Sequence, residues 1–304
     1  MRRWINDGNQ FEDTDNRYHQ HHGKPLLGTG EWLFEDPHFT HWIDRHSRSN
    51  ILWLSGGAGV GKSVLCSHAI DTLRASHEQS AVDFYYFTFD EDIDLFMAYR
   101  SIAMQLYYEV YTEDEEISEH VYQCTRGTPN LRSVKDLIEI LISELESIFI
   151  FVDGLDEESS DKARWEITSD IVSFLVDIAK REMSPLKLWC SSQDRRYIRD
   201  ILSGCEEIQL GAAMNNQDIE KLFRDALDKE FMELDSKTKT NILVDLKRQM
   251  NGNFLWASFM LDTIGAAPDL KQLYADIIEG LPEDFEKYLE KIASFHSKQH
   301  HFLR

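Results

Sequence analysis

The stretch Gly56-Gly57-Ala58-Gly59-Val60-Gly61-Lys62-Ser63 decides how this sequence is interpreted. It matches G-x-x-x-x-G-K-[ST], the pattern of a loop that binds phosphate groups. The glycines let the backbone curl so that successive N–H groups point at phosphate oxygens, and a following helix directs its positive end to the same place. We expect Lys62 to bind the outer phosphates of a nucleotide and the Ser63 hydroxyl to bind Mg²⁺.

The residues on both sides of this loop supply the context that the motif requires. Residues 51–54 form a short apolar run typical of a buried strand, and residues 62–74 have the pattern of a helix. A strand, loop and helix in this order predict that residues 56–63 bind ATP or GTP together with Mg²⁺. The alternative is a glycine-rich turn without a ligand.

A second motif is acidic and follows another apolar run. Residues 148–152 are apolar and end at Asp153, which is followed by Gly154-Leu155-Asp156-Glu157. Ligands of open α/β sheets bind at the carboxyl ends of the strands, so Asp153 is predicted to hold Mg²⁺ directly or through water. Glu157, with Asp156 as its competitor, is predicted to orient or deprotonate the attacking water. The alternative for this segment is a solvated acidic loop.

Strands alternate with helices over residues 51–210, which predicts an α/β fold with a parallel sheet covered by helices on both faces. Asp36-Pro37 further predicts the start of a short helix ahead of the first strand. The expected strands are 51–54, 81–89, 148–152, 186–191 and 206–210, and the expected helices between them are 62–74, 93–110, 133–145 and 167–178.

After Leu210 the patterns are helical. Asn215 or Asn216 is predicted to cap the first of these helices, and Asn251-Gly252-Asn253 is predicted to break the series. The helices expected beyond the first are 236–250, 254–264 and 268–279. We therefore divide the chain into a polar N-terminal segment (1–27), a P-loop NTPase core (28–210) and a helical appendage with a frayed C-terminal tail (211–304).

Composition excludes several classes of protein. The 304 residues are 42% hydrophobic and 28% charged, which is a globular balance with enough apolar material for a core. The formal net charge of −22 argues against a broad surface for nucleic acid or for an anionic membrane. No apolar run is long enough to span a bilayer, and the four scattered cysteines suit buried thiols in a reducing compartment, so we expect a cytoplasmic protein.

The two motifs, in this order, resemble those of NACHT-type STAND NTPases, the nucleotide switches of NLR-like proteins. Further stretches resemble the fungal branch of that family, so that the similarity extends over about residues 28–290. These stretches are Gly28-Thr29-Gly30-Glu31-Trp32-Leu33, Leu186-Lys187-Leu188-Trp189-Cys190-Ser191-Ser192, Asn215-Asn216-Gln217-Asp218-Ile219, Asn251-Gly252-Asn253-Phe254-Leu255-Trp256-Ala257 and Leu281-Pro282.

The resemblance implies a five-stranded parallel sheet with the phosphate-loop strand at its centre, followed by a small helical domain. It also implies slow hydrolysis of ATP or GTP with Mg²⁺, nucleotide-controlled assembly and a role in signal transduction. Thr29 and Trp32 would lie near the base and ribose, although core packing is the simpler explanation for Trp32.

The sequence departs from the family in two ways. Gln193 stands where many members place an arginine that senses the γ-phosphate, with Arg195 and Arg196 close by, and the chain stops at Arg304 without a winged-helix domain. These departures keep three hypotheses open: a slow NTPase switch, a nucleotide-stabilised interaction module with little turnover, and a kinase for a small metabolite. An apolar face left uncovered on the helices of 211–290 is expected to favour self-association or a partner protein.

Overall fold

The computed structural model describes residue 4 and residues 28–77, 80–87, 94–111, 118–156, 162–232, 234–247 and 249–266. The chain divides into two compact units, residues 1–215 and 216–304, which we describe separately. The sequence-based boundary after residue 210 falls at the end of the last strand, whereas the units divide shortly afterwards, inside a helix.

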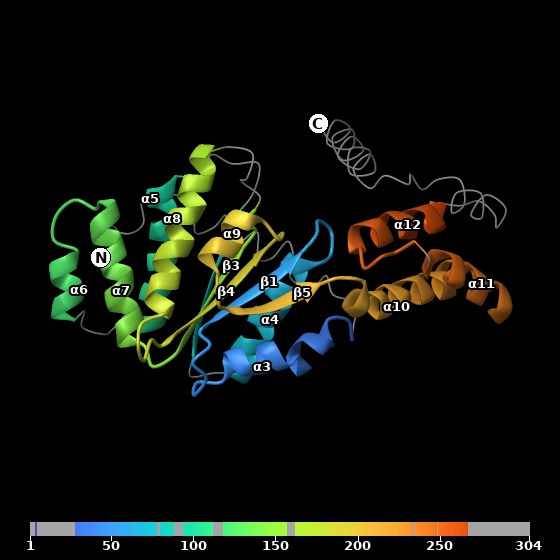
Figure 1. The fold of residues 1–304 in the computed structure, drawn as a ribbon, viewed down its shortest axis with the longest axis horizontal. Coiled ribbons are helices and arrows are strands. Elements are labelled where there is room, and N and C mark those ends of the chain that lie inside the picture. The colour runs from blue at the N-terminus through green and yellow to red at the C-terminus, as the bar shows by residue number, and fades with distance from the viewer. Residues whose placement is uncertain are drawn as a thin grey trace. The chain divides into compact units, whose positions relative to one another are not determined.

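A parallel sheet of five strands forms the middle of the first unit (Figure 1). Its strands are β1 (Ile51–Gly56), β2 (Ala81–Tyr86), β3 (Ile148–Asp153), β4 (Leu186–Ser192) and β5 (Glu206–Leu210). Every residue of β1 to β4 is buried, as expected for strands covered on both faces. The α/β fold predicted from the sequence is confirmed.

The strand order is β2-β3-β4-β1-β5. The expectation that the phosphate-loop strand lies at the centre is wrong, because the middle strand is β4 and β1 lies between β4 and β5. Strand β4 is inserted between the two strands that carry the motifs. The carboxyl end of β4 therefore lies between the end of β1 and the end of β3.

Helices cover both faces of the sheet (Figure 1). The short η1 (Glu31–Glu35), α3 (Pro37–Ile43) and α4 (Lys62–Ser76) pack on one face, against alternate strand residues such as Leu52 and Leu54. The other face of the sheet presents Ile51 and Trp53 of β1. It is covered by α5 (Leu95–Val110), α6 (Glu119–Cys124), α7 (Leu131–Glu144), α8 (Lys162–Ala179) and α9 (Arg196–Ile201).

Several predicted boundaries differ from the structure, among them those of β2 and α7. Strand β2 ends at Tyr86, and residues 88–89 of the predicted strand lie outside the described residues. Helix α7 begins at Leu131 because Asn130 caps it, in a reciprocal pair of hydrogen bonds with Ser133. The four cysteines are free thiols, of which Cys66 and Cys190 are buried.

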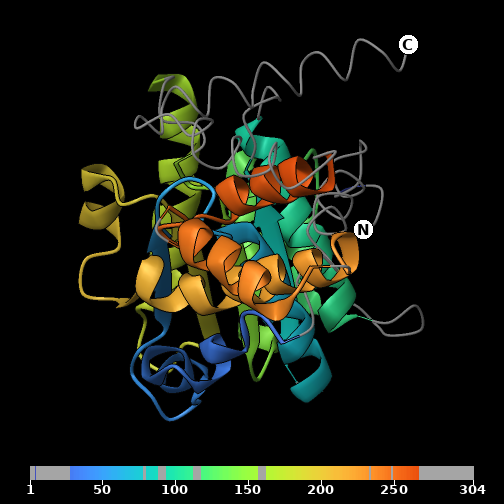
Figure 2. The ribbon, with the colours of Figure 1, turned by 90° about the vertical axis from the view of Figure 1, so that its right-hand side faces the viewer.

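In the second unit, α11 (Ser236–Lys247) and α12 (Phe254–Ala266) pack with the later turns of α10 (Ala212–Glu230) around one apolar cluster (Figure 2). The cluster includes Phe223, Leu227, Ile242, Leu246 and Trp256. The predicted break before α12 is confirmed, since Asn251 and Gly252 have left-handed backbone conformations. The predicted helix over 268–279 lies outside the described residues, and no helix in the described part of the chain is long and apolar enough to cross a membrane.

Candidate nucleotide site

The loop between β1 and α4 has a backbone that only glycine adopts without strain at two positions. Gly59 has φ 75° and Gly61 has φ 91°, both in the left-handed region. Gly56 is needed for a different reason, because a Cβ atom there would lie 2.9 Å from the Cβ of Leu210. Backbone conformation and close packing thus account for three glycines of the motif.

The side chains of Lys62 and Ser63 lie at the start of α4. The Lys62 ammonium donates hydrogen bonds of 2.9 Å to the backbone oxygens of Gly56 and Gly57, so it lies over the loop. The Ser63 hydroxyl donates to Asp153 at 2.5 Å, across a separation of 90 residues in the chain. The two motifs that the sequence analysis singled out therefore meet in space.

Asp153 is the last residue of β3 and is buried. One carboxylate oxygen accepts the hydrogen bond from Ser63, and the other accepts one from Ser191, which is paired with Asp153 in the parallel register of β3 and β4. Hydrogen bonds from α4 and β4 therefore hold this carboxylate in one orientation at the carboxyl ends of the strands.

Asp156 and Glu157, the two candidates for activating water, differ in what the structure shows. Asp156 is buried, and its carboxylate accepts a hydrogen bond of 2.8 Å from the backbone N–H of Gln193. It thus joins the turn after β3 to the turn after β4. Glu157 lies outside the described residues.

Gln193, at the position expected for a γ-phosphate sensor, forms hydrogen bonds through both its backbone and its side chain. The backbone of Gln193 is bound by Asp156, and its side-chain oxygen accepts a hydrogen bond of 3.1 Å from the Arg195 guanidinium. Arg195 and Arg196 are exposed just before and at the start of α9. Arg195 therefore contacts the side chain of Gln193.

The sequence analysis missed one residue of the site and misjudged another. The hydrogen bond from Ser191 to Asp153 was not foreseen, although the shared carboxyl edge of parallel strands was a signal for it. The prediction that Asn215 or Asn216 caps a helix is wrong, because α10 begins at Ala212, directly after β5. Asn215 instead lies inside the first turns, buried, and donates a hydrogen bond of 2.8 Å to the backbone oxygen of Val60 in the phosphate-binding loop.

The segment that precedes η1 lies against α4. Gly30 has φ 76°, and a Cβ atom there would lie 2.8 Å from Leu65 of α4. Thr29 is buried, while Trp32 is partly buried against the apolar cluster on the α4 face of the sheet. Core packing therefore accounts for Trp32.

A family model described as Nephrocystin 3, N-terminal, matches residues 28–193, which is more than half of the chain. The chain belongs to the Nephrocystin 3 N-terminal family. The matched segment begins at Gly28 and ends at Gln193, so it includes the phosphate-binding loop, the acidic motif and the tip of β4. No curated protein sequence matches the chain significantly.

Solved structures are similar in fold at low sequence identity. The Walker-type ATPase PABY2304 of Pyrococcus abyssi has a TM-score of 0.50 and 14% identity, over 82% of this chain and 72% of that protein. The ADP form of the Aeropyrum pernix ORC2 protein has a TM-score of 0.46 and 12% identity, over 91% of this chain and 72% of that protein. Only the first is similar enough to support an argument, and it supports a P-loop ATPase fold.

The family segment contains the donor atoms that a magnesium nucleotide requires. Successive N–H groups of residues 56–63 and the Lys62 ammonium are suited to phosphate oxygens. The Ser63 hydroxyl and the Asp153 carboxylate are hard oxygen donors that lie in contact, and Mg²⁺ binds such donors together with phosphate oxygens and water. These residues therefore fit Mg²⁺ and a nucleoside phosphate.

Proposed function

We propose that this chain binds ATP or GTP with Mg²⁺ and hydrolyses it slowly, as a cytoplasmic nucleotide switch of the NACHT type. The hydrogen bond between Ser63 and Asp153 carries the proposal. It brings the Ser63 hydroxyl, at the start of α4, to the Asp153 carboxylate, at the end of β3. A cation bound to a nucleotide would use both groups as ligands. In a glycine-rich turn without a ligand, nothing would require these two groups to meet.

In the proposed reaction each described residue has a role that follows from its position, and the role of Glu157 follows from the sequence motif. The N–H groups of the loop and Lys62 hold the phosphates, while Ser63 and Asp153 hold Mg²⁺, which neutralises negative charge on the phosphates when it is bound. Asp156 positions the turn that carries Gln193, and Glu157 orients the attacking water. With a glutamine in place of a cationic sensor, less charge is neutralised at the γ-phosphate, so turnover is expected to be slow.

A calorimetric titration with Mg·ATP and Mg·GTP tests the proposal. Wild-type protein should bind at least one of them, and Lys62→Ala should weaken that binding at least about tenfold, the equivalent of about 1.4 kcal/mol. Lys229→Ala, which removes an exposed lysine of α10, is the matched control and should bind as the wild type does. Equal affinity of the Lys62→Ala protein would overturn the assignment, and the nucleotide that co-purifies with the protein would identify the base.

The second candidate function is an interaction module that nucleotide stabilises without appreciable turnover, and Gln193 is the observation that favours it. Phosphate release from bound triphosphate separates the two functions. Gln193→Arg should raise turnover or the preference for triphosphate over diphosphate if the side chain faces the γ-phosphate. A wild-type protein that binds triphosphate and releases no phosphate would favour the interaction module.

Regulation through the helices after β5 is part of the proposed switch. Asn215 at the start of α10 donates a hydrogen bond to Val60 in the phosphate-binding loop, so a change in the conformation of that loop alters a contact of α10. We expect self-association or binding of a partner protein through residues 211–304 to depend on the bound nucleotide. The mass of the protein in solution with ATP and with ADP measures this dependence, and nucleic acid and membranes are not expected as partners.

A further inference from the structure

A hollow of about 640 Å³ lies at the amino ends of the strands, at the edge of the sheet opposite the nucleotide site. It is formed by the loop before β1, the loop between α8 and β4 and the residues before β5. Strand β1 runs from the hollow to the phosphate-binding loop, and a strand of six residues is about 17 Å long. The hollow therefore lies apart from the candidate nucleotide site.

Positive charge dominates the lining of this hollow. Arg45, Arg48, Lys180 and Arg181 line it, against the carboxylate of Glu182. In a protein with a formal net charge of −22, such a concentration of cations is unexpected. Charges beyond about 8 Å are largely screened at physiological ionic strength, so these cations, rather than the acidic remainder of the surface, act on an anion inside the hollow.

The cations of the hollow are only partly neutralised by the protein. Arg181 forms an ion pair of 2.8 Å with Glu139, and the hydrogen bond of Arg45 goes to the uncharged Ser80 hydroxyl. For Arg48 and Lys180, the described residues supply neither an ion pair nor a hydrogen bond to the side chain. Two charged groups with eight N–H donors between them, five on Arg48 and three on Lys180, therefore remain available to a ligand.

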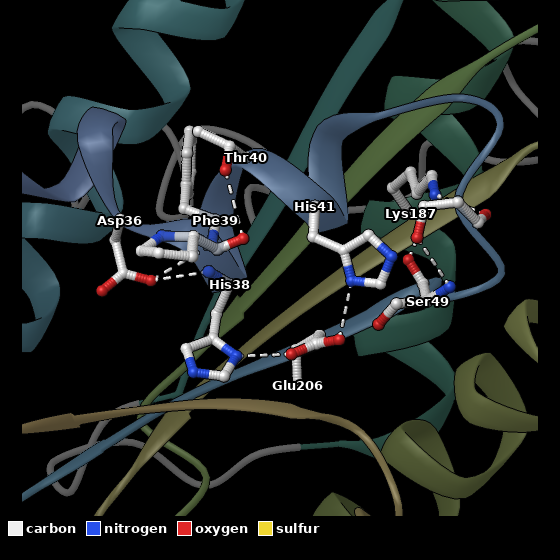
Figure 3. A network of polar contacts seen from close by, with 10 residues as sticks. Asp36, His38, Phe39, Thr40, His41, Ser49, Lys187 and Glu206 are labelled. Carbon is white, nitrogen blue, oxygen red and sulfur yellow. Dashed lines mark hydrogen bonds and ion pairs between the residues drawn. The ribbon is translucent and has the colours of Figure 1, made fainter.

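The loop that carries Arg45 and Arg48 is fixed in place. Lys187 of β4 donates hydrogen bonds to the backbone oxygens of Ser47 and Ser49, at 3.4 and 3.1 Å (Figure 3). Asn50 donates to the oxygen of Ala179 at 2.9 Å, which connects this loop to the end of α8. A ligand thus meets a preformed arrangement and does not have to order the loop.

We propose that this hollow binds a small anion that carries at least two phosphate groups. The volume is that of a small-molecule site, too small for a folded partner. Arginine guanidinium groups match phosphate oxygens in pairs, and each phosphate monoester carries a charge of about −1.5 to −2 at neutral pH. With Glu182 and the Glu139 partner of Arg181 counted, two net positive charges remain, and an anion with two phosphate groups can offer one phosphate to each of the two cations unpaired among the described residues, Arg48 and Lys180.

Titration with inorganic pyrophosphate tests the proposal in the Lys62→Ala protein, in which we expect binding at the phosphate-binding loop to be weakened. We expect saturable binding of one pyrophosphate per chain at physiological ionic strength. Adding Arg48→Gln and Lys180→Gln should weaken this binding at least about tenfold, because two direct charge-assisted contacts are lost. Citrate, at the same concentration, should bind more weakly than pyrophosphate.

The matched control is Arg132→Gln with Lys237→Gln in the same Lys62→Ala background. Both residues are exposed, neither lines the hollow, and the net charge changes by the same amount. This control should bind pyrophosphate with unchanged affinity, and circular dichroism verifies that all variants are folded. An equal loss in both pairs, no saturable binding at all, or equal affinity for citrate would overturn the proposal.

Discussion

At the scale of single residues, Asp153 is the group on which the two motifs converge. Its carboxylate accepts hydrogen bonds from Ser63 on α4 and Ser191 on β4, so it is held by both neighbours. Asp153 can be replaced by an amide of the same shape, since both serine hydroxyls rotate to donate or accept. The negative charge that Mg²⁺ requires is then removed while the packing is kept.

We therefore expect Asp153→Asn to lower the affinity for Mg-nucleotide at least about tenfold, or about 1.4 kcal/mol, with little effect on binding without Mg²⁺. Paired titrations with and without Mg²⁺ measure this difference. Ser191→Ala is the matched control, because it removes a hydrogen bond to Asp153 and keeps the carboxylate and Ser63. A similar loss of Mg²⁺ dependence in both variants would show that orientation, not charge, is what Asp153 supplies.

At the scale of elements, α10 contains two neighbouring asparagines whose side chains bind different parts of the chain. Asn215 donates to Val60 in the phosphate-binding loop, whereas Asn216 accepts a hydrogen bond of 2.8 Å from the backbone N–H of Gly252. Each bond satisfies a backbone group, but at different places along the chain. Substituting each asparagine in turn therefore distinguishes an effect on the nucleotide site from an effect on the stability of the second unit.

Asn215→Ala should weaken nucleotide binding and destabilise the first unit by about 1–3 kcal/mol, because the Val60 oxygen is left buried without its donor. Asn216→Ala should destabilise the second unit and leave nucleotide affinity unchanged. Denaturant unfolding and nucleotide titration of both variants measure these outcomes. Equal nucleotide affinity in the Asn215→Ala and wild-type proteins would exclude a positioning role for Asn215.

A second element-scale feature joins α3 to the edge strand β5. Figure 3 shows Glu206 between His38 and His41, whose ring nitrogens lie 2.5 and 2.8 Å from its two carboxylate oxygens. The hydrogen bond to Glu206 raises the pKa of His38 above 6.5, with Asp36 contributing, and the same bond lowers the pKa of Glu206 below 4.5. Both residues are therefore charged together over an intermediate pH range.

The sign of the pH effect follows from these two shifts. The raised pKa of His38 stabilises the fold below pH 6.5, and this contribution is lost as the pH rises through the pKa of the folded state. The lowered pKa of Glu206 stabilises the fold above pH 4.5, and this contribution is lost as the pH falls. The contact should therefore stabilise most between these two values.

Urea unfolding tests this with His38→Gln, which should cost more stability at about pH 6 than at about pH 8.5. The cost should stay below about 1 kcal/mol, because the histidine is half exposed and solvent screens the pair. His120→Gln removes an exposed histidine of α6 and should show no such difference. A cost of His38→Gln that is the same at both pH values would mean that packing, not charge, holds α3 on β5.

At the scale of the whole molecule, the two compact units have separate apolar clusters, and the candidate nucleotide site lies in the first. Ligand at about 100 times its dissociation constant stabilises the state that binds it by about 2.7 kcal/mol. In a unit of this size that corresponds to a rise in unfolding temperature of about 5–10 °C.

We therefore expect Mg-nucleotide to raise the unfolding temperature of the first unit and to leave that of the second unit unchanged. Scanning calorimetry of the full chain measures both transitions. The Lys62→Ala protein is the control, and at the same nucleotide concentration its rise should be at most about half as large. A nucleotide-dependent shift of the second transition alone would place the binding site outside the first unit.

The sequence by itself determined the features that depend on neighbours in the chain. The left-handed glycines of the loop, the Asp36 cap of α3 and the alternation of strands with helices all follow from local backbone preferences, and the structure confirms them. The positions of Lys62, Ser63 and Asp153 follow as well, because parallel strands put their carboxyl ends at one edge.

Only the tertiary structure decided the features that join distant parts of the chain. The place of β4 between β1 and β3, the bond from Asp156 to Gln193 and the bond from Asn215 to Val60 depend on the order in which strands pair. That order is set by packing the whole sheet between its helices, and buried polar groups then bond to whatever partner the packing brings near. Asparagine before a helical pattern is ordinarily a cap, and here the helix that begins directly after β5 turned Asn215 into a support of the phosphate-binding loop instead.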